Sequence, residues 1–191
     1  MEFKEAMQLV KSGHVFDSKK ELDLLKLSNE FGWTIAHELA ERQIWFDPIK
    51  QRNILLLKDE TGESVAHVMA RCGYIFDPEK HRSLLYLRDK EGSTVAHSMA
   101  ELGYFFDPNS IYVKLKDKEG HSVAAEMAIH GFLFDENQHL NLLLMKDIYQ
   151  YSVAYYQIFY SHTKFTNPQI LALPNPDGGT LKDLLKGGKV K

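Results

Sequence analysis

The sequence lacks several features that would restrict its location. Cys72 is the only cysteine, so no disulfide can form within the chain, which fits a reducing compartment. No stretch reaches the roughly 20 consecutive apolar residues that a membrane-spanning helix needs. The N-terminal segment MEFKEAMQLVKSG has no apolar signal-peptide core. We therefore expect a soluble protein of the cytoplasm.

The charge balance and the missing motifs exclude further classes of function. The formal net charge is −3 at pH 7, and without a basic stripe nothing favours a nucleic acid or membrane partner. The segment PDGGT at 176–180 has neither the length nor the lysine of a phosphate-binding loop. No nucleophile elbow and no metal-binding helix motif occurs. We expect no enzyme activity, no cofactor and no metal site.

What the sequence does contain is a repeat. The segment GESVAHVMARCGYIFDP at 62–78 returns as GSTVAHSMAELGYFFDP at 92–108, and related segments begin at Gly32 and Gly120. The phenylalanine of each Phe-Asp step recurs at intervals of 30, 30, 30 and 28 residues, at positions 16, 46, 76, 106 and 134. A fixed period of this size indicates stacked repeats, because one unit cannot bury its own apolar face.

We predict that the whole chain, residues 1–191, forms a single repeat array. Its predicted parts are an N-terminal half-repeat cap (1–27), four repeats (28–57, 58–87, 88–115 and 116–145), a degenerate repeat (146–173) and a C-terminal cap (174–191).

Each unit has recognisable start and stop signals. DKEG at 89–92 is typical of a turn, and Ser93 or Thr94 supplies an N-cap for the helix that follows. Gly103 is suited to end that helix. Asp107-Pro108 predicts an N-cap and first position of a second helix, although the alternating apolar residues in IYVKL at 111–115 suit a strand better.

The segment TVAHSMAELG at 94–103, after its Asp-x-x-Gly turn, resembles the first helix of an ankyrin repeat. The family pattern is Thr-Pro-Leu-His-x-Ala-Ala-x-x-Gly. Matching residues in three copies are Asn29, Gly32, Thr34, His37; Asp59, Gly62, Ser64, His67; and Asp89, Gly92, Thr94, His97.

This chain departs from the ankyrin pattern in three ways. Its period is 30 residues against about 33, its second helix is short, and the family's proline is replaced by Ile35, Val65, Val95 or Val123. The resemblance implies an all-α solenoid of helix-turn-helix repeats with short turn fingers. Another stacked helix-hairpin repeat is the alternative.

The recurring histidines invite comparison with a metal site. Equivalent residues of stacked helices lie on the order of 8–10 Å apart, whereas zinc ligands lie about 2 Å from the ion. Neighbouring copies of His37, His67 and His97 therefore do not share an ion. The resemblance implies instead that each imidazole hydrogen-bonds the backbone of the adjacent turn.

Two other reactive residue types have structural explanations. The aspartates of the repeated Asp-Pro step, Asp47, Asp77 and Asp107, fit N-capping better than acid–base chemistry. Cys72 has no base on its own helix face, since His67 is five residues away. We interpret Cys72 as an ordinary thiol.

Positions that differ between copies are the candidates for recognition, because the fold does not fix them. In the ankyrin family such positions line a groove that holds proteins, and the resemblance implies the same use here. The candidate partner-binding residues are Trp33, Arg42, Arg71, Glu101, Leu102, Ile129, His130, Tyr149, Tyr156, Phe159 and Tyr160.

The fifth copy concentrates aromatic residues between positions 149 and 160. Aromatic side chains are enriched at binding hot spots, but they also fill imperfect junctions in a core. Both interpretations stay open for this cluster.

The sequence thus predicts a non-enzymatic module that binds a partner protein. Short divergent arrays of this kind suit bacterial, phage or viral antagonists of host proteins. Two alternatives remain. One is a small-ligand or catalytic protein with a pocket near Tyr155, Tyr160, His162 and Asp147, and the other is a self-associating structural protein.

Overall fold

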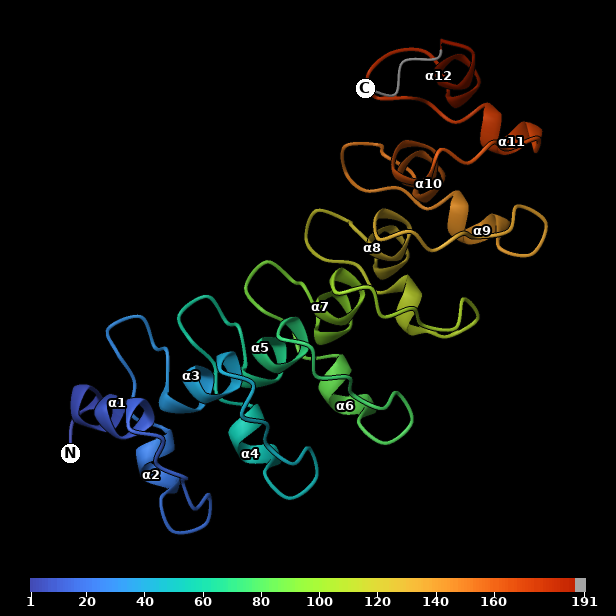
Figure 1. Cartoon of the computed structure of the whole chain (residues 1–191). Helices are drawn as coiled ribbons and strands as arrows, with labels where there is room; N and C mark the ends of the chain where they lie inside the picture. The colour runs from blue at the N-terminus through green and yellow to red at the C-terminus, as the bar shows by residue number, and fades with distance from the viewer. Residues whose placement is uncertain (188–191) are drawn as a thin grey trace. The chain divides into compact units, whose positions relative to one another are not determined.

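The computed structural model describes residues 1–187 of the 191-residue chain. Its contacts divide into two compact units, one of residues 1–99 and one from residue 100 onwards. We call them unit 1 and unit 2 and describe each by itself (Figure 1). The last residues of the predicted C-terminal cap, 188–191, lie outside the described part.

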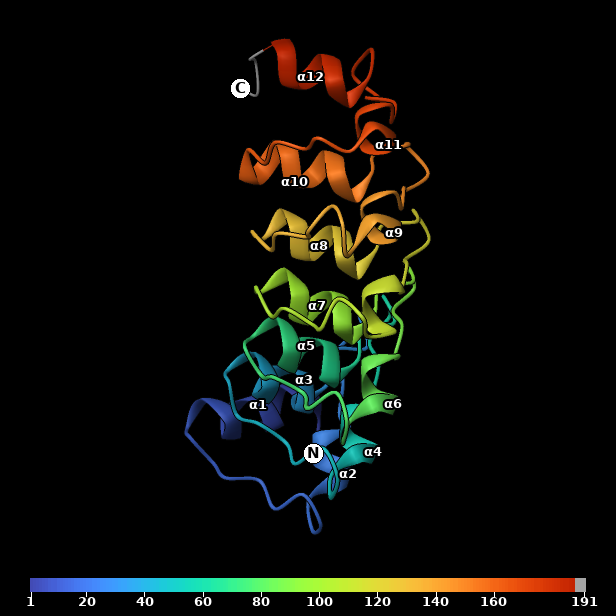
Figure 2. The ribbon, with the colours of Figure 1, turned by 90° about the vertical axis from the view of Figure 1, so that its right-hand side faces the viewer.

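Unit 1 alternates longer and shorter helices. The longer ones, α1 (Phe3–Lys11), α3 (Ile35–Glu41) and α5 (Val65–Arg71), pack against one another in sequence order. Three short helices follow them in turn, α2 (Leu22–Leu25), α4 (Arg52–Leu55) and α6 (Arg82–Leu85). In Figure 2 the longer helices α1, α3 and α5 lie side by side. Helix α7 (Val95–Glu101) begins in unit 1 and ends in unit 2.

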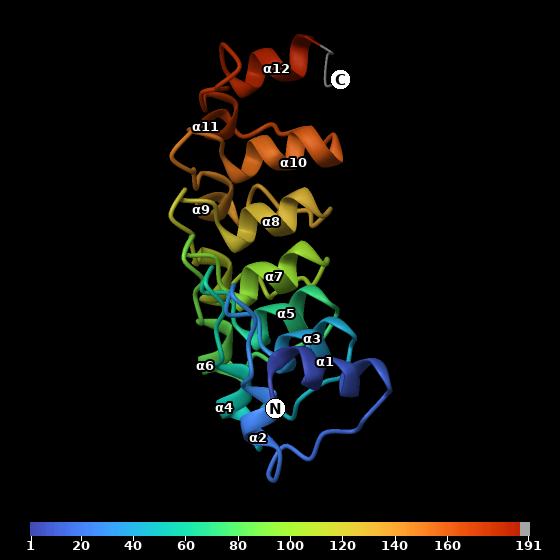
Figure 3. The same cartoon turned by 90° about the vertical axis from the view of Figure 1, so that its left-hand side faces the viewer.

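Unit 2 follows the same order. A 3-10 turn, η1 (Tyr112–Lys114), precedes α8 (Val123–Ile129), and α9 (Leu140–Leu143) precedes α10 (Val153–Ser161). The chain then forms α11 (Pro168–Leu171) and α12 (Leu181–Gly187), which contact each other. Helices α8 and α10 lie side by side, with α9 at one end of them (Figure 3).

The prediction of an all-α fold is confirmed for residues 1–187. Within that range the only extended pairs are isolated antiparallel bridges, which close the turns before α3, α5, α7, α8, α10 and α12, as between Lys58 and Ser64. None of the helices described has the length and apolar character required to cross a bilayer.

Helices α3, α5 and α10 begin as predicted, at a hydroxyl side chain. Thr34, Ser64 and Ser152 each accept a hydrogen bond from the backbone N–H three residues ahead. These bonds satisfy an N–H that a helix start leaves without an intrahelical partner. The first helix of the third copy ends as expected too, because Gly103 has a φ of +81° and donates to the carbonyl of Ala100.

The turns before α5, α7, α8 and α10 are each held by an aspartate, and the turn before α3 is held by Asn29. In one copy, Asp59 Oδ1 accepts 2.9 Å hydrogen bonds from the backbone N–H groups of Thr61 and Glu63. Successive turns are also joined directly within unit 1, since Lys90 N donates to Thr61 O at 2.8 Å. In unit 2, Ile148 N donates to Glu119 O at the same distance of 2.8 Å.

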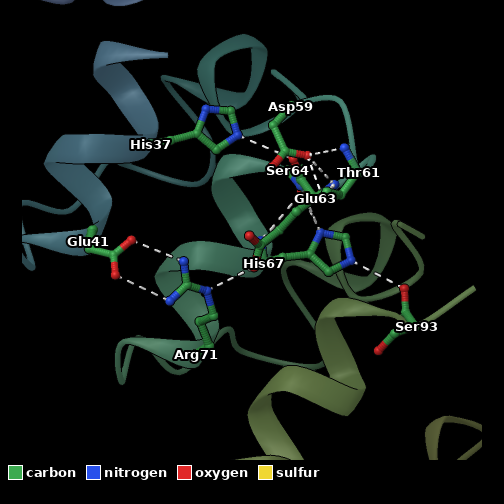
Figure 4. A network of polar contacts seen from close by, with 9 residues as sticks. All are labelled: His37, Glu41, Asp59, Thr61, Glu63, Ser64, His67, Arg71 and Ser93. Atoms are coloured by element: carbon green, nitrogen blue, oxygen red, sulfur yellow. Dashed lines mark hydrogen bonds and ion pairs between the residues drawn. The ribbon is translucent and has the colours of Figure 1, made fainter. Parts of the chain in front are cut away.

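The prediction for the histidines is confirmed in unit 1, where His37 and His67 bond to the next turn. His67 Nδ1 accepts from the N–H of Ser64 at 3.2 Å, which leaves the hydrogen on Nε2. That nitrogen lies 3.3 Å from the carbonyl oxygen of Ser93. His37 lies 3.2 Å from the carbonyl of Glu63 in the same way (Figure 4). Each buried imidazole therefore links its own helix cap to the following module.

Burial keeps these imidazoles neutral. It lowers the pKa of His67 from 6.5 to about 4, and it lowers the pKa of His37 as well. Because the unfolded chain takes up these protons first, stability is full above about pH 6.5 and falls as the pH drops towards 4.

The core repeats with the modules. In unit 1, Val65 and Leu85 are fully buried, and so is Phe76 of the Phe-Asp step. In unit 2, Val123, Leu143 and Phe134 occupy the equivalent positions and are at most 2% exposed. Apolar burial of this kind is the main favourable contribution to folding, and it falls on the residues that recur between copies.

The prediction for the second helix is wrong. Proline does not open it: α4 begins at Arg52, four residues after Pro48. Asp47 instead caps a separate turn, because its Oδ1 accepts from the N–H groups of Ile49 and Lys50 at 2.9 Å. The alternation at 111–115 does not form a strand either, since residues 112–114 are a 3-10 turn in which Tyr112 and Val113 are both buried.

The close approach of neighbouring turns gives a test of the stacking. At Gly62 the φ is +80° and an added Cβ would lie 2.8 Å from Lys90 N. At Gly73 the φ is also positive, but no atom lies within 4 Å of such a Cβ. We expect Gly73→Ala to lower the free energy of unfolding by about 1 kcal/mol, because alanine is strained at a positive φ. Gly62→Ala should lower it by at least about twice as much, because its Cβ also meets the next turn.

Chemical denaturation of the two variants measures this difference. Equal losses of unfolding free energy would show that the turns do not approach each other as closely as described.

Candidate functional site

All the predicted partner-binding residues lie at least partly on the surface. Arg42, Glu101, Leu102, His130, Tyr149 and Tyr160 are exposed, and Trp33, Arg71, Ile129, Tyr156 and Phe159 are half-buried. The structure groups some of them into two patches, one in each unit. We call them the arginine patch (Trp33, Glu41, Glu63 and Arg71) and the tyrosine patch (Asp147, Tyr151, Tyr155, Tyr156, Phe159, Tyr160 and Asp177).

The arginine patch is built around one guanidinium group. Arg71, near the end of α5, places Nη2 3.0 Å from Oε2 of Glu41 and Nε 2.8 Å from Oε1 of Glu63 (Figure 4). Glu41 comes from the preceding helix α3, and Glu63 from the turn before α5. Burial raises the pKa of Glu63, and the charge and hydrogen bond of Arg71 oppose that rise.

An aromatic ring completes this patch. The Arg71 guanidinium carbon lies 5.9 Å from the centre of the Trp33 ring, within cation–π range. Trp33 also lies against the His37 imidazole, with ring centres 4.9 Å apart. Of the other predicted residues, Arg42 pairs with Glu38 on its own helix at 2.8 Å. The arginine patch therefore holds one guanidinium group between two carboxylates.

The tyrosine patch consists of rings in mutual contact along α10 and the turn before it. The centre of the Tyr155 ring lies 4.7 Å from Tyr151, 5.8 Å from Tyr156 and 5.8 Å from Phe159. Phe159 in turn contacts Tyr160 at 5.2 Å. Tyr155 is 7% exposed and belongs to the core, whereas Tyr160 is 51% exposed. The cluster therefore has both a buried and an exposed side.

The hydroxyls of this patch bind carboxylates. Tyr156 donates to Asp147 Oδ2 at 2.7 Å, and Tyr155 donates to Asp177 Oδ2 at 2.9 Å. Tyr151 lies 3.3 Å from Asp177 Oδ1. Burial, followed by these carboxylates, raises the pKa of both Tyr155 and Tyr156, so the two phenols stay neutral.

Histidines border the tyrosine patch. The His121 ring meets the Tyr156 ring edge-on at 5.3 Å, and its Nε2 lies 2.9 Å from Oε1 of Glu126. His130 lies 3.6 Å from the other oxygen of Glu126. Glu126 raises the pKa of His121 against the effect of burial. When His121 is charged, Glu126 is therefore its partner.

The differences between repeat copies in the sequence predicted these surface positions, but they did not predict the hydrogen bonds and ion pairs between them. Asp177 was missed because it belongs to the loop before α12, 22 residues from Tyr155 in sequence. The signal was a turn-forming Asn-Pro-Asp-Gly stretch, which occupies the place of the Asp-x-x-Gly turn of other copies. Tyr149, also predicted, lies 3.3 Å from Glu119 through its hydroxyl.

The residues of the catalytic alternative are divided between separate interactions. Asp147 is bound by Tyr156, and Tyr155 by Asp177, while His162 adopts a φ of +53° at the end of α10. Among residues 1–187 there is no group of three or more His, Cys, Asp or Glu side chains arranged to hold a metal. Burial raises the pKa of Cys72, which disfavours the reactive thiolate.

Comparison with known proteins does not assign the chain to a family. No family model matches the sequence, and no curated protein matches it either.

The bond between Tyr156 and buried Asp147 gives a test of the tyrosine patch. Tyr156→Phe keeps the ring but removes a 2.7 Å hydrogen bond to a carboxylate that is 8% exposed. We expect the variant to lose about 1–3 kcal/mol of unfolding free energy, as measured by urea denaturation.

Tyr160→Phe is the matched control, because its hydroxyl stands on an exposed side chain. We expect Tyr160→Phe to lose less than about 0.5 kcal/mol of unfolding free energy. Similar losses in the two variants would contradict the structural role of the Tyr156 hydroxyl.

Proposed function

We propose that the protein is a non-enzymatic binding module of ankyrin-like repeats that recognises a partner protein. The observation that carries this proposal is the contrast between framework and surface. The same turn, cap and buried apolar residues recur from copy to copy, as at Thr34, Ser64, Ser122 and Ser152. The accessible positions beside them vary between copies.

The contrast favours recognition because repeated positions are explained by folding, while exposed positions are free to change. Position by position, Arg71 on α5 corresponds to Glu101 on α7, Ile129 on α8 and Phe159 on α10. Unlike side chains at one position of a repeated module are what a protein needs to distinguish one partner surface from others.

An ankyrin-like solenoid is part of this proposal. It is supported by the aspartate-held turn, the left-handed glycine and the imidazole that bonds to the next turn. We also propose a cytoplasmic location and a role against a host protein, both of which rest on the sequence alone.

One observation favours self-association as a second candidate. The residue before the phenylalanine of the Phe-Asp step is apolar and exposed in several copies. In unit 1, Val15 and Ile75 are 88% and 61% exposed, and in unit 2 Leu133 is 61% exposed. Recurring exposed apolar residues are unusual unless they are covered by another molecule.

Site-specific photo-crosslinking tests the proposal. A benzophenone amino acid is placed at Tyr160, an exposed variable position, and in a control protein at Ile49, an exposed position on the turn after Asp47. In host cells that produce the protein we expect a discrete adduct with a host protein from position 160. The purified partner should then bind the wild type directly.

Alanine substitutions then show which surface binds the partner. Tyr160→Ala should weaken binding of that partner about tenfold, as expected of a hot-spot aromatic residue, and Ile49→Ala should change it less than about twofold. Adducts only from position 49, or equal effects of the two substitutions, would contradict binding through the variable face. An adduct with a second copy of the chain would favour self-association instead.

A further inference from the structure

Aromatic rings join neighbouring copies at the connector, which is the segment between each longer helix and its Phe-Asp step. In unit 1 the centres of the Trp45 and Tyr74 rings lie 5.8 Å apart. In unit 2 the rings of Phe105 and Phe132 lie 5.3 Å apart in the same way. Tyr74 also lies 4.8 Å from Phe76 of its own Phe-Asp step. A ring two residues before that phenylalanine therefore packs both on its own copy and on the preceding one.

The first pair of connectors in unit 1 has aliphatic residues at these positions. Val15 corresponds to Trp45 one copy later, and Ile44 corresponds in the same way to Tyr74. Val15 and Ile44 are 88% and 50% exposed, and a cavity of about 260 Å³ lies between their connectors. Phe16, which lines this cavity, is half-buried, whereas the four later phenylalanines of the Phe-Asp step are at most 6% exposed. The boundary that a ring fills in the next copy is therefore open here.

The wall of this cavity suits an aromatic ring. Three rings contribute to it, those of Phe16, Trp45 and Phe46. Val10 and Leu39 add aliphatic side chains. Contacts between rings are more favourable than their buried area alone would give. An apolar cavity of roughly 150 Å³ holds one benzene molecule, so this one has room for a single aromatic side chain.

Charge complementarity requires a neutral occupant. Among the described residues that line the cavity, His14 alone is ionisable, and its Nε2 lies 3.1 Å from Oε1 of Glu21. Gln51 also lines the cavity, and its Oε1 accepts a hydrogen bond from the backbone N–H of Asp47 at 2.5 Å. A charged group that entered the cavity would lose its hydration without gaining a partner of opposite charge.

We propose that this cavity binds an aromatic side chain of another protein, whose ring takes the place that the Tyr74 ring takes at the next boundary. Val15 and Ile44 line the cavity and are exposed, so the segment that carries the ring can continue over the surface. Pockets for free ligands of drug size are larger, about 300–1,000 Å³, which favours a side chain. The inference goes beyond the proposed function, because none of the predicted partner-binding residues lines the cavity.

The direct test is a titration with a capped glycine peptide that carries one central phenylalanine. Nuclear magnetic resonance of the 13C-methyl-labelled full chain should show saturable shifts for the methyl groups of Val10, Leu39 and Ile44, which line the cavity. The same peptide with cyclohexylalanine, which keeps the size but is not aromatic, should bind at least about threefold more weakly. A peptide with glutamate at this position should give no saturable shifts.

Ile44→Tyr supplies the ring from within the chain. We expect the variant to fold as the wild type does, since Tyr74 occupies the equivalent position one copy later. It should bind the phenylalanine peptide at least about tenfold more weakly, because an attached ring has a far higher effective concentration at the cavity than a free peptide. The peptide comparison in the wild type decides the question even if this variant does not fold.

Ile75→Tyr is the matched control. It adds the same ring to unit 1 at a connector position that is 61% exposed and does not line the cavity. Its affinity for the phenylalanine peptide should stay within about twofold of the wild type.

The possible results separate this inference from the proposed function. Equal binding of the phenylalanine and cyclohexylalanine peptides, or equal affinities of the Ile44→Tyr and Ile75→Tyr variants, would overturn the aromatic site. Saturable shifts with toluene but none with the peptide would show that the cavity takes a free small molecule, which would overturn the protein source. A dimer in light scattering that Ile44→Tyr abolishes would show that the ring comes from a second copy, against the proposal. None of these results bears on the adduct from position 160, so the proposed function is tested separately.

Discussion

The structure depends on a hydrogen bond that one buried side chain makes to the next module. In unit 1 the imidazole of His67 accepts from the N–H of Ser64 with one nitrogen and reaches the carbonyl of Ser93, 3.3 Å away, with the other. A buried polar group without a partner is costly, typically by about 1–3 kcal/mol. The bond therefore requires a second turn at a fixed place, and in unit 1 it makes the modules of His37 and His67 depend on their neighbours.

This constraint leaves part of the surface free. The cap and the buried apolar residues recur because the fold needs them in every module, and the histidine recurs in the first three full copies, at His37, His67 and His97. Beside them, the accessible positions of the longer helices carry an arginine in one copy and aromatic rings in another, as at Arg71 and Phe159. The same framework thus presents an arginine held by two glutamates in unit 1 and tyrosines that donate to aspartates in unit 2.

Sequence reasoning succeeded where one residue determines one local conformation. Serine or threonine at the helix start, glycine after its end and histidine in the cap each have a short-range cause, and each was found. It failed at the Asp-Pro step, because proline is equally suited to the first position of a turn and of a helix. The turn was selected by burial of the Phe-Asp phenylalanine and of the short helix, for example Phe76 and Leu85.

The links across longer separations were not readable in the sequence. The bond from Tyr155 to Asp177 spans 22 residues and the pair of Arg71 and Glu41 spans 30. Comparing copies showed which positions are variable, but not which of their side chains already have partners within the chain.

The most direct measurement of the central bond is the 15N chemical shift of the imidazole nitrogens of His67, followed as a function of pH. We expect a neutral ring with its hydrogen on Nε2 at pH 7, and no protonation until the pH approaches the folded-state pKa of about 4. A hydrogen on Nδ1, or titration near the ordinary histidine value of about 6.5, would contradict the account.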